Sequence, residues 1–180
     1  MISKKLIRKR YLYKREKKYF SVNSTFFDPL IKFLKNNKNT NLGIYYPTSY
    51  ELDILNIFKI SFFKRFKIYL PIIDKRSSMN FYKWKEKDVL YVNKFGILEP
   101  FKSRPIIPGV ILVPLLAFDN NKHRLGYGKG FYDKFLNMHS KKNKKIITIG
   151  VAFSFQKYHK LPINNKDYKL DFILTEKGII

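Results

Sequence analysis

The chain has 180 residues, of which 45% are hydrophobic, and its 37 Lys and Arg outnumber 13 Asp and Glu to give a formal net charge of +24. This length suffices for one α/β domain with a substantial core and is too short for two large ones. The absence of cysteine excludes disulfides and thiolate metal sites, and no apolar run approaches the roughly 20 residues of a membrane helix. Charges recur every few positions near the N-terminus, which rules out a secretory signal. We therefore expect one domain over residues 1–180, located in the cytoplasm and without a membrane partner.

In chain order, the pattern first predicts a basic helix over residues 3–20, with Leu6, Tyr13 and Phe20 on its apolar face. Three further helices are expected, over residues 28–38, 51–63 and 131–138. Strands are predicted between them by short β-branched and aromatic runs, at residues 43–46, 67–70, 110–114, 145–152 and 172–174. Residues 80–84 and 89–92 are expected to form a hairpin added to the sheet. Helices alternating with apolar strands indicate an α/β fold, a three-layer α/β/α sandwich with a mostly parallel, Rossmann-like sheet.

The segment Arg-Leu-Gly-Tyr-Gly-Lys-Gly-Phe-Tyr-Asp, residues 124–133, carries more chemical information than any other stretch. Its three glycines allow positive φ angles and close approach of a ligand, while Arg124 and Lys129 place cations beside exposed N–H groups. A predicted strand precedes it and a predicted helix follows, which is the arrangement in which a helix N-terminus faces an anion. The spacing matches neither the dinucleotide-binding loop nor the P-loop. From the glycines alone, a phosphate site and a Gly-rich surface turn are equally good interpretations.

Several further segments accompany this loop in a consistent order. Together they resemble the 5-formyltetrahydrofolate cyclo-ligases, also called methenyltetrahydrofolate synthetases. The resemblance rests on residues 113–119 and 124–136, the basic pair Lys4 and Arg8, and residues 45–51, 70–71, 79–84, 95–100, 150–156 and 171–176. It spans nearly the whole chain and implies the three-layer α/β fold expected above.

The activity implied by the resemblance is ATP-dependent cyclisation of 5-formyltetrahydrofolate to 5,10-methenyltetrahydrofolate, with release of ADP and phosphate through a phosphorylated formyl intermediate. Lys129 and Arg124 would stabilise the developing charge, and Asp133 and Asp167 would bind Mg²⁺. The residues expected to contact ATP are Lys4, Arg8, Arg124, Leu125, Gly126, Tyr127, Gly128, Lys129, Gly130, Phe131 and Tyr132. The residues expected to contact the folate are Tyr46, Glu51, Tyr127, Gly128, Lys129, Gly130 and Phe131, with Glu51 orienting the pterin.

Simpler interpretations exist for several of these residues. Without the resemblance, Lys4 and Arg8 look like part of a solvated basic helix, although their four-residue spacing places both on one face. Asp133 also suits the first turn of a helix, where an acidic residue complements the dipole. Phe81, Tyr82 and Trp84 are equally suited to line a folate pocket and to fill the core.

Two other functional classes fit parts of the sequence. The net charge of +24 is typical of a nucleic-acid-binding module. The excess is mostly Lys, however, and accompanies frequent Asn, Ile, Phe and Tyr, a mixture that A/T-rich codon usage produces without selection for a ligand. A sugar-phosphate or CoA-handling enzyme on a similar scaffold is the second class, because fold alone does not determine function. We expect a monomer that binds a folate as its small-molecule substrate, and we do not expect nucleic acid to be a partner.

Overall fold

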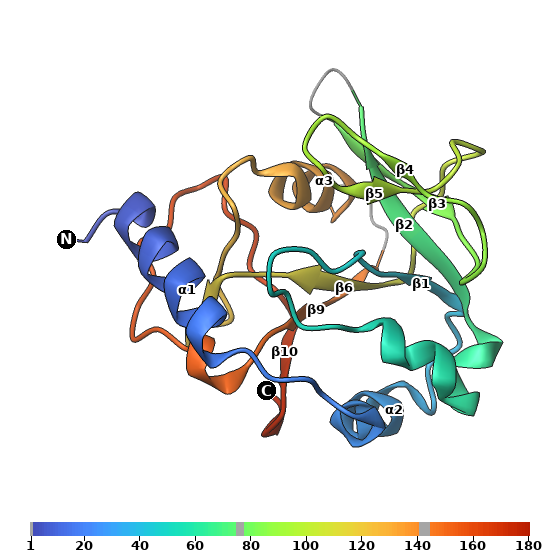
Figure 1. The fold of residues 1–180 in the computed structure, drawn as a ribbon, viewed down its shortest axis with the longest axis horizontal. Helices are drawn as coiled ribbons and strands as arrows, with labels where there is room; N and C mark the ends of the chain where they lie inside the picture. The colour runs from blue at the N-terminus through green and yellow to red at the C-terminus, as the bar shows by residue number, and fades with distance from the viewer. Residues whose placement is uncertain (1, 75–77, 141–144) are drawn as a thin grey trace.

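A computed structural model describes residues 2–74, 78–140 and 145–180. Within these residues a seven-stranded sheet has the order β11-β10-β9-β6-β1-β2-β3 (Figure 1). The five strands from β10 to β2 are parallel to their neighbours, and the edge strands β3 and β11 are antiparallel. The strands are β1 Asn41–Gly43, β2 Lys67–Ile73, β3 Met79–Lys83, β6 Val110–Pro114, β9 Ile147–Val151, β10 Phe172–Thr175 and β11 Gly178–Ile179.

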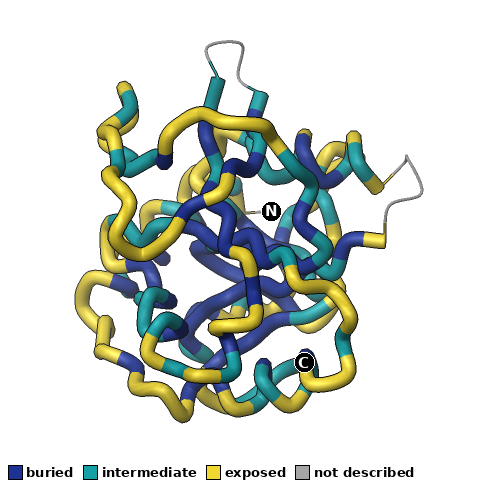
Figure 2. Tube along the Cα trace, turned by 90° about the vertical axis from the view of Figure 1, so that its right-hand side faces the viewer, coloured by how far each residue is buried: buried dark blue, intermediate teal, exposed yellow. Residues whose placement is uncertain are grey.

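Helices cover both faces of this sheet, because successive strand residues point to opposite sides. Leu112 of β6 packs in the core on one face, and Val113 packs in the core on the other. The first face is covered by α2 (Asp28–Leu34) and by the 3₁₀ helices η1 (Ser24–Phe27), η2 (Leu55–Lys59) and η3 (Ser61–Arg65), whereas α3 (Phe131–Ser140) covers the second. In Figure 1, α3 and α2 lie on opposite sides of the strands, and Figure 2 shows buried segments running through the middle of the molecule. The prediction of a three-layer, mostly parallel α/β fold is confirmed.

The N-terminal helix α1 (Lys4–Lys18) begins after Ser3, whose side chain accepts a hydrogen bond from the Leu6 amide. Its predicted apolar face is wrong, because Leu6 and Tyr13 are 57% and 63% exposed. The buried face instead carries Ile7, Tyr11 and Arg15, spaced four residues apart. Ile7 and Tyr11 pack against a two-stranded ribbon formed by β7 (Ala117–Phe118) and β8 (Arg124–Leu125). This ribbon follows β6, so α1 lies beyond the carboxyl end of that strand (Figure 1).

The α-helix predicted over residues 51–63 is wrong. The segment forms η2 and η3, which meet at Ile60, where the backbone is extended. The Tyr45 hydroxyl donates to the Leu52 carbonyl, and the Asp53 carboxylate accepts from the Leu55 amide. In a continuous helix starting at residue 51, the Leu52 carbonyl and the Leu55 amide would instead form hydrogen bonds within the helix. The many aromatic and β-branched side chains of this segment also favour short turns that pack on the sheet.

The hairpin predicted between residues 80–84 and 89–92 is also wrong. β3 pairs with β2, and β4 (Tyr91–Val92) pairs with β5 (Leu98–Glu99) in a separate two-stranded sheet. One Glu99 carboxylate oxygen accepts from the Ile73 amide and from the Asn93 side chain, which joins this small sheet to the end of β2. Several boundaries differ as well. The largest differences are that α2 ends at Leu34 rather than at residue 38, and that the first strand is Asn41–Gly43 rather than residues 43–46.

The aromatic residues of β3 belong mainly to the core. Phe81 and Tyr82 are 0% and 2% exposed. Trp84 is also buried, in contact with the rings of Tyr46 and Phe58. It lines a cavity of about 390 Å³, and neither Glu51 nor the glycine loop (residues 126–130) contributes to the lining of that cavity. Among the described residues, no helix is long and apolar enough to cross a membrane.

Candidate active site

The glycine loop connects β8 to α3 and lies between α1 and the sheet. Gly128 and Gly130 have φ angles of +103° and +68°, in a backbone region that residues with a side chain rarely adopt. A Cβ at Gly128 would lie 3.3 Å from Cζ of Arg8, and one at Gly126 would lie 2.8 Å from Nη1 of Arg124. The glycines therefore permit both the backbone turn and the close approach of two arginines.

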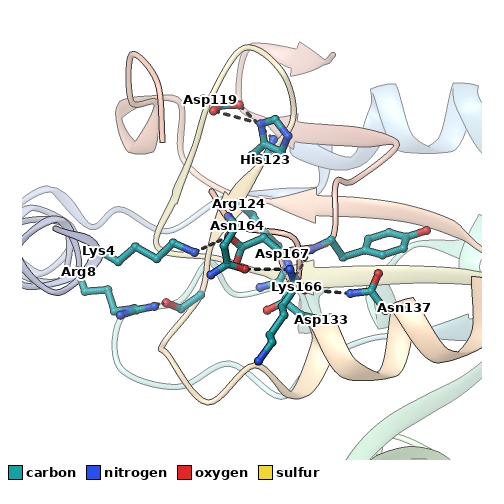
Figure 3. Close-up of polar contacts among 12 residues, drawn as sticks. Lys4, Arg8, Asp119, His123, Arg124, Asp133, Asn137, Asn164, Lys166 and Asp167 are labelled. Atoms are coloured by element: carbon teal, nitrogen blue, oxygen red, sulfur yellow. Dashed lines mark hydrogen bonds and ion pairs between the residues drawn. The ribbon is translucent and has the colours of Figure 1, made fainter. Parts of the chain in front are cut away.

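The basic pair Lys4 and Arg8 lies on one face of α1, as its four-residue spacing predicts, and Arg8 contacts this loop. Arg8 Nε donates to the Gly126 carbonyl at 2.8 Å. Lys4 forms an ion pair with Asp167 (Figure 3). Both side chains extend from the same side of the helix in Figure 3, so that α1 places two cations beside the glycine loop.

The two candidate metal ligands, Asp133 and Asp167, lie close together although 34 positions separate them. Asp133, in the first turn of α3, accepts from Arg124 Nη2 at 2.8 Å and from the Tyr168 amide at 3.2 Å. Tyr168 follows Asp167 directly, so this bond brings the two aspartates into the same region (Figure 3). No cluster of three or more His, Cys, Asp or Glu with metal-binding geometry occurs in the described ranges. Two carboxylates nevertheless fit Mg²⁺, which commonly takes one or two from the protein and completes its shell with substrate phosphates and water.

Glu51 lies on the other side of the glycine loop and is 7% exposed. Its Oε1 accepts from the Tyr127 hydroxyl at 2.5 Å, and its Oε2 accepts from the Thr48 amide at 2.9 Å. Burial raises the pKa of Glu51, while the hydrogen bonds from Tyr127 and Thr48 and the charge of Arg15 lower it. The fold therefore joins the candidate pterin carboxylate to the middle of the candidate phosphate loop.

The side chains of the remaining loop residues point to different surroundings. Leu125 is buried against Ile7 and Leu116, so only its backbone is available to a ligand. Lys129 is exposed, and its Nζ lies 5.8 Å from the centroid of the Phe95 ring. Phe131 lies beside the same ring, at 6.0 Å between centroids. Phe95 was not among the residues predicted to contact ATP or folate, although residues 95–100 are one of the segments that resemble the cyclo-ligases.

Three buried polar atoms near the loop have no hydrogen-bond partner within the described part of the chain. They are Arg124 Nε, Tyr132 Oη and Arg15 Nε. Burial raises the pKa of Tyr132, so its hydroxyl stays protonated at neutral pH. Buried polar groups are nearly always paired in folded proteins, and clustered exceptions indicate a place where a ligand supplies the missing partners. Arg15 was not predicted as a site residue, because a cation within a basic helix resembles a solvated one.

Comparisons with known proteins identify the family of this chain. The model of the 5-formyltetrahydrofolate cyclo-ligase family matches residues 2–176. The chain is 33% identical over 136 residues to the 5-formyltetrahydrofolate cyclo-ligase of Mycoplasma genitalium, covering 74% of this chain and 71% of that protein. It is 26% identical over 152 residues to the corresponding protein of Haemophilus influenzae, covering 81% and 80%.

A solved structure shows the same fold at similar identity. The solution structure of Aquifex aeolicus 5,10-methenyltetrahydrofolate synthetase superposes with a TM-score of 0.77 and 30% identity, covering 99% of this chain and 92% of that one. The match of the family model to residues 2–176 includes both the loop and Glu51. The chain therefore belongs to the 5-formyltetrahydrofolate cyclo-ligase family.

Proposed function

We propose that this protein converts 5-formyltetrahydrofolate and ATP into 5,10-methenyltetrahydrofolate, ADP and phosphate. The observation that carries the proposal is the 2.5 Å hydrogen bond between Tyr127 and Glu51. It joins the segment suited to a nucleotide phosphate to a carboxylate suited to a reduced pterin, and phosphoryl transfer requires that the two substrates lie in line. Family membership and the unpaired donors around the loop support the same function.

The chemistry begins with a poor leaving group, since the formyl oxygen does not depart from carbon unaided. That oxygen attacks the γ-phosphorus of ATP, and the bond from phosphorus to ADP breaks. The N10 amine then adds to the activated formyl carbon and loses its proton, and the C–O bond breaks to release phosphate. No protein nucleophile is required, so the protein contributes positioning and charge stabilisation.

The proposed roles follow from the positions of the side chains. Arg124 lies in β8 just before the loop and Lys129 lies within the loop, and both would balance the negative charge that develops on the transferred phosphoryl group. Lys4 and Arg8 would contact the phosphates from α1. In the structure the carboxylates of Asp167 and Asp133 pair with Lys4 and Arg124, respectively, and bound nucleotide would give these cations phosphate partners. The freed carboxylates would then hold Mg²⁺, which neutralises phosphate charge when bound.

The folate side is proposed from Glu51 and its surroundings. An ionised carboxylate accepts hydrogen bonds from the N–H groups of a reduced pterin and so sets its orientation. Tyr46, Tyr127 and Phe131 would supply flat apolar contact to the ring system. The loop backbone at Gly128 and Gly130 would lie where the formyl group meets the γ-phosphate.

A direct assay tests the proposal. Purified protein is mixed with 5-formyltetrahydrofolate, ATP and Mg²⁺, and methenyl absorbance is followed, with omission of each component and addition of EDTA as controls. We expect a signal that needs all three components, and a loss of about 100-fold or more in kcat for Lys129→Ala. Lys94→Ala, which changes another lysine beside Phe95, is the matched control and should retain activity. Absence of methenyl product from the folded wild-type protein would refute the function, and equal rates for Lys129→Ala and wild type would remove Lys129 from it.

A further inference from the structure

Among the described residues, Arg15 and Asp119 are the most deeply buried charged residues that the mechanism above does not use, and Arg15 is the cation of the two. Its side chain is 1% exposed, and it ends the buried face that α1 forms with Ile7 and Tyr11. Nη2 donates to the Ser49 carbonyl at 2.5 Å, and Cζ lies 5.4 Å from the centroid of the Tyr127 ring. One side chain thus contacts the turn before Glu51 and the residue that binds Glu51.

The turn that Arg15 contacts is conformationally costly. Ser49 and Tyr50 have φ angles of +46° and +61°, in the left-handed region that non-glycine residues rarely occupy. Such residues persist where surrounding contacts hold them, and they cluster at functional sites. The Glu51 amide donates to the Thr48 carbonyl and the Thr48 amide returns a bond to the Glu51 carboxylate, so this turn sets the position of that carboxylate. Arg15 holds the middle of the turn by the Ser49 carbonyl.

A purely structural role explains Arg15 poorly. Burying a guanidinium costs free energy unless the group is paired. Among the described residues, Arg15 forms no ion pair, and its Nε has no hydrogen-bond partner. Well-packed apolar side chains of similar volume often replace buried charges without loss of stability. The charge and the fork geometry of arginine are therefore better explained by what they do for the adjacent site.

We propose that Arg15 is a positioning residue that acts through the 49–50 turn and the Tyr127 ring. By holding both, it keeps the Glu51 carboxylate fixed and ionised where the pterin binds. Arg8, two helical turns before Arg15 on the same helix, contacts the adjacent glycine loop. The inference rests on the proposed function, because it assigns Arg15 to the folate side of that reaction. α1 then serves both substrates, with Lys4 and Arg8 at the phosphates and Arg15 behind the pterin carboxylate.

The electrostatic surroundings make this proposal testable by pH. The titratable groups facing Glu51 are Tyr45, Tyr127 and Tyr132, and burial raises the pKa of all three, so they remain neutral across the assay range. Arg15 is the cation that lowers the pKa of Glu51. Removing its charge should raise that pKa further, which moves the acid limb of kcat/KM for 5-formyltetrahydrofolate to higher pH.

The experiment compares Arg15→Met, Arg15→Lys and Arg10→Met in the methenyl-absorbance assay, with thermal melting of each protein. Arg10 is an exposed arginine of the same helix, so Arg10→Met controls for loss of one positive charge. For Arg15→Met we expect KM for 5-formyltetrahydrofolate to rise about tenfold, with an acid limb at higher pH. Arg15→Lys should return the limb toward its wild-type position, because it keeps the charge, and should recover only part of the KM.

The outcomes separate this inference from the proposed function. An inactive wild-type protein refutes the function, whereas an active wild type with Arg15→Met indistinguishable from Arg10→Met refutes the role of Arg15 alone. A lower melting temperature with an unmoved acid limb would show a structural role only. If Arg15→Met does not fold, Arg15→Lys tests the positioning role instead. A wild-type KM for 5-formyltetrahydrofolate in Arg15→Lys would contradict the need for the guanidinium fork.

Discussion

Replacing Tyr127 with Phe removes one oxygen atom at the point where the two halves of the site meet. The hydroxyl donates to Glu51 Oε1 at 2.5 Å, and the carboxylate that receives it is 7% exposed. A hydrogen bond to a charged group contributes about 1.5–3 kcal/mol. Although Tyr127 as a whole is 43% exposed, the low exposure of the Glu51 carboxylate limits the access of water that could replace this bond. Each 1.4 kcal/mol corresponds to a factor of ten, so the loss converts to about 10- to 100-fold in affinity for a ligand that needs a fixed carboxylate.

The assay for this variant is the dependence of methenyl formation on each substrate. We expect KM for 5-formyltetrahydrofolate to rise by the factor above, while KM for ATP changes much less, because the loop backbone and Lys129 are retained. Tyr13→Phe is the matched control, since Tyr13 is 63% exposed on α1 and should behave as wild type. A KM for 5-formyltetrahydrofolate within about twofold of wild type would refute the claim that Tyr127 orients Glu51 for the substrate.

Two further predictions concern the loop and the buried carboxylate. Gly128→Ala places a Cβ against Arg8 and should raise KM for ATP, whereas Gly96→Ala, also at positive φ but with nothing within 4 Å, should cost similar stability and leave that KM unchanged. Equal kinetic effects of the two alanines would contradict this. Because burial raises the pKa of Glu51 above 4.5, its contribution to stability is present at low pH and is lost as pH rises through the folded-state pKa. Glu51→Gln, whose amide still pairs with Tyr127 and Thr48, should remove this dependence, so wild type should lose stability relative to the variant as pH rises above 4.5 in urea unfolding. A stability difference that does not change with pH would show that Glu51 does not titrate abnormally.

Local patterns predicted the elements that are buried on both faces. The apolar runs at residues 67–70, 110–114 and 172–174 all lie in strands, because a β-branched run bounded by turn residues suits few other environments. The helix after the glycine loop also appears where predicted, with Asp133 in its first turn. These elements depend mainly on residues that are close in the sequence, so the local residue pattern is enough to predict them.

Elements whose form depends on distant partners were predicted less well. Residues 51–63 have helical spacing but form two 3₁₀ helices, because Tyr45 and the sheet compete for their groups. Residues 89–92 pair with β5 instead of β3, because β3 pairs with β2. On α1 the pattern placed Leu6 and Tyr13 inside, whereas the ribbon of β7 and β8 buries the neighbouring face.

The sequence by itself determined the strand-loop-helix unit, its glycines and cations, and the family to which the chain belongs. Only the tertiary structure decided that Tyr127 meets Glu51 across 76 positions, that Lys4 pairs with Asp167 across 163, and that Arg15 is buried against Ser49. The physical reason is that periodicity reports which side of an element is buried. The partner of a buried polar group depends instead on which segments the topology brings to the same end of the sheet.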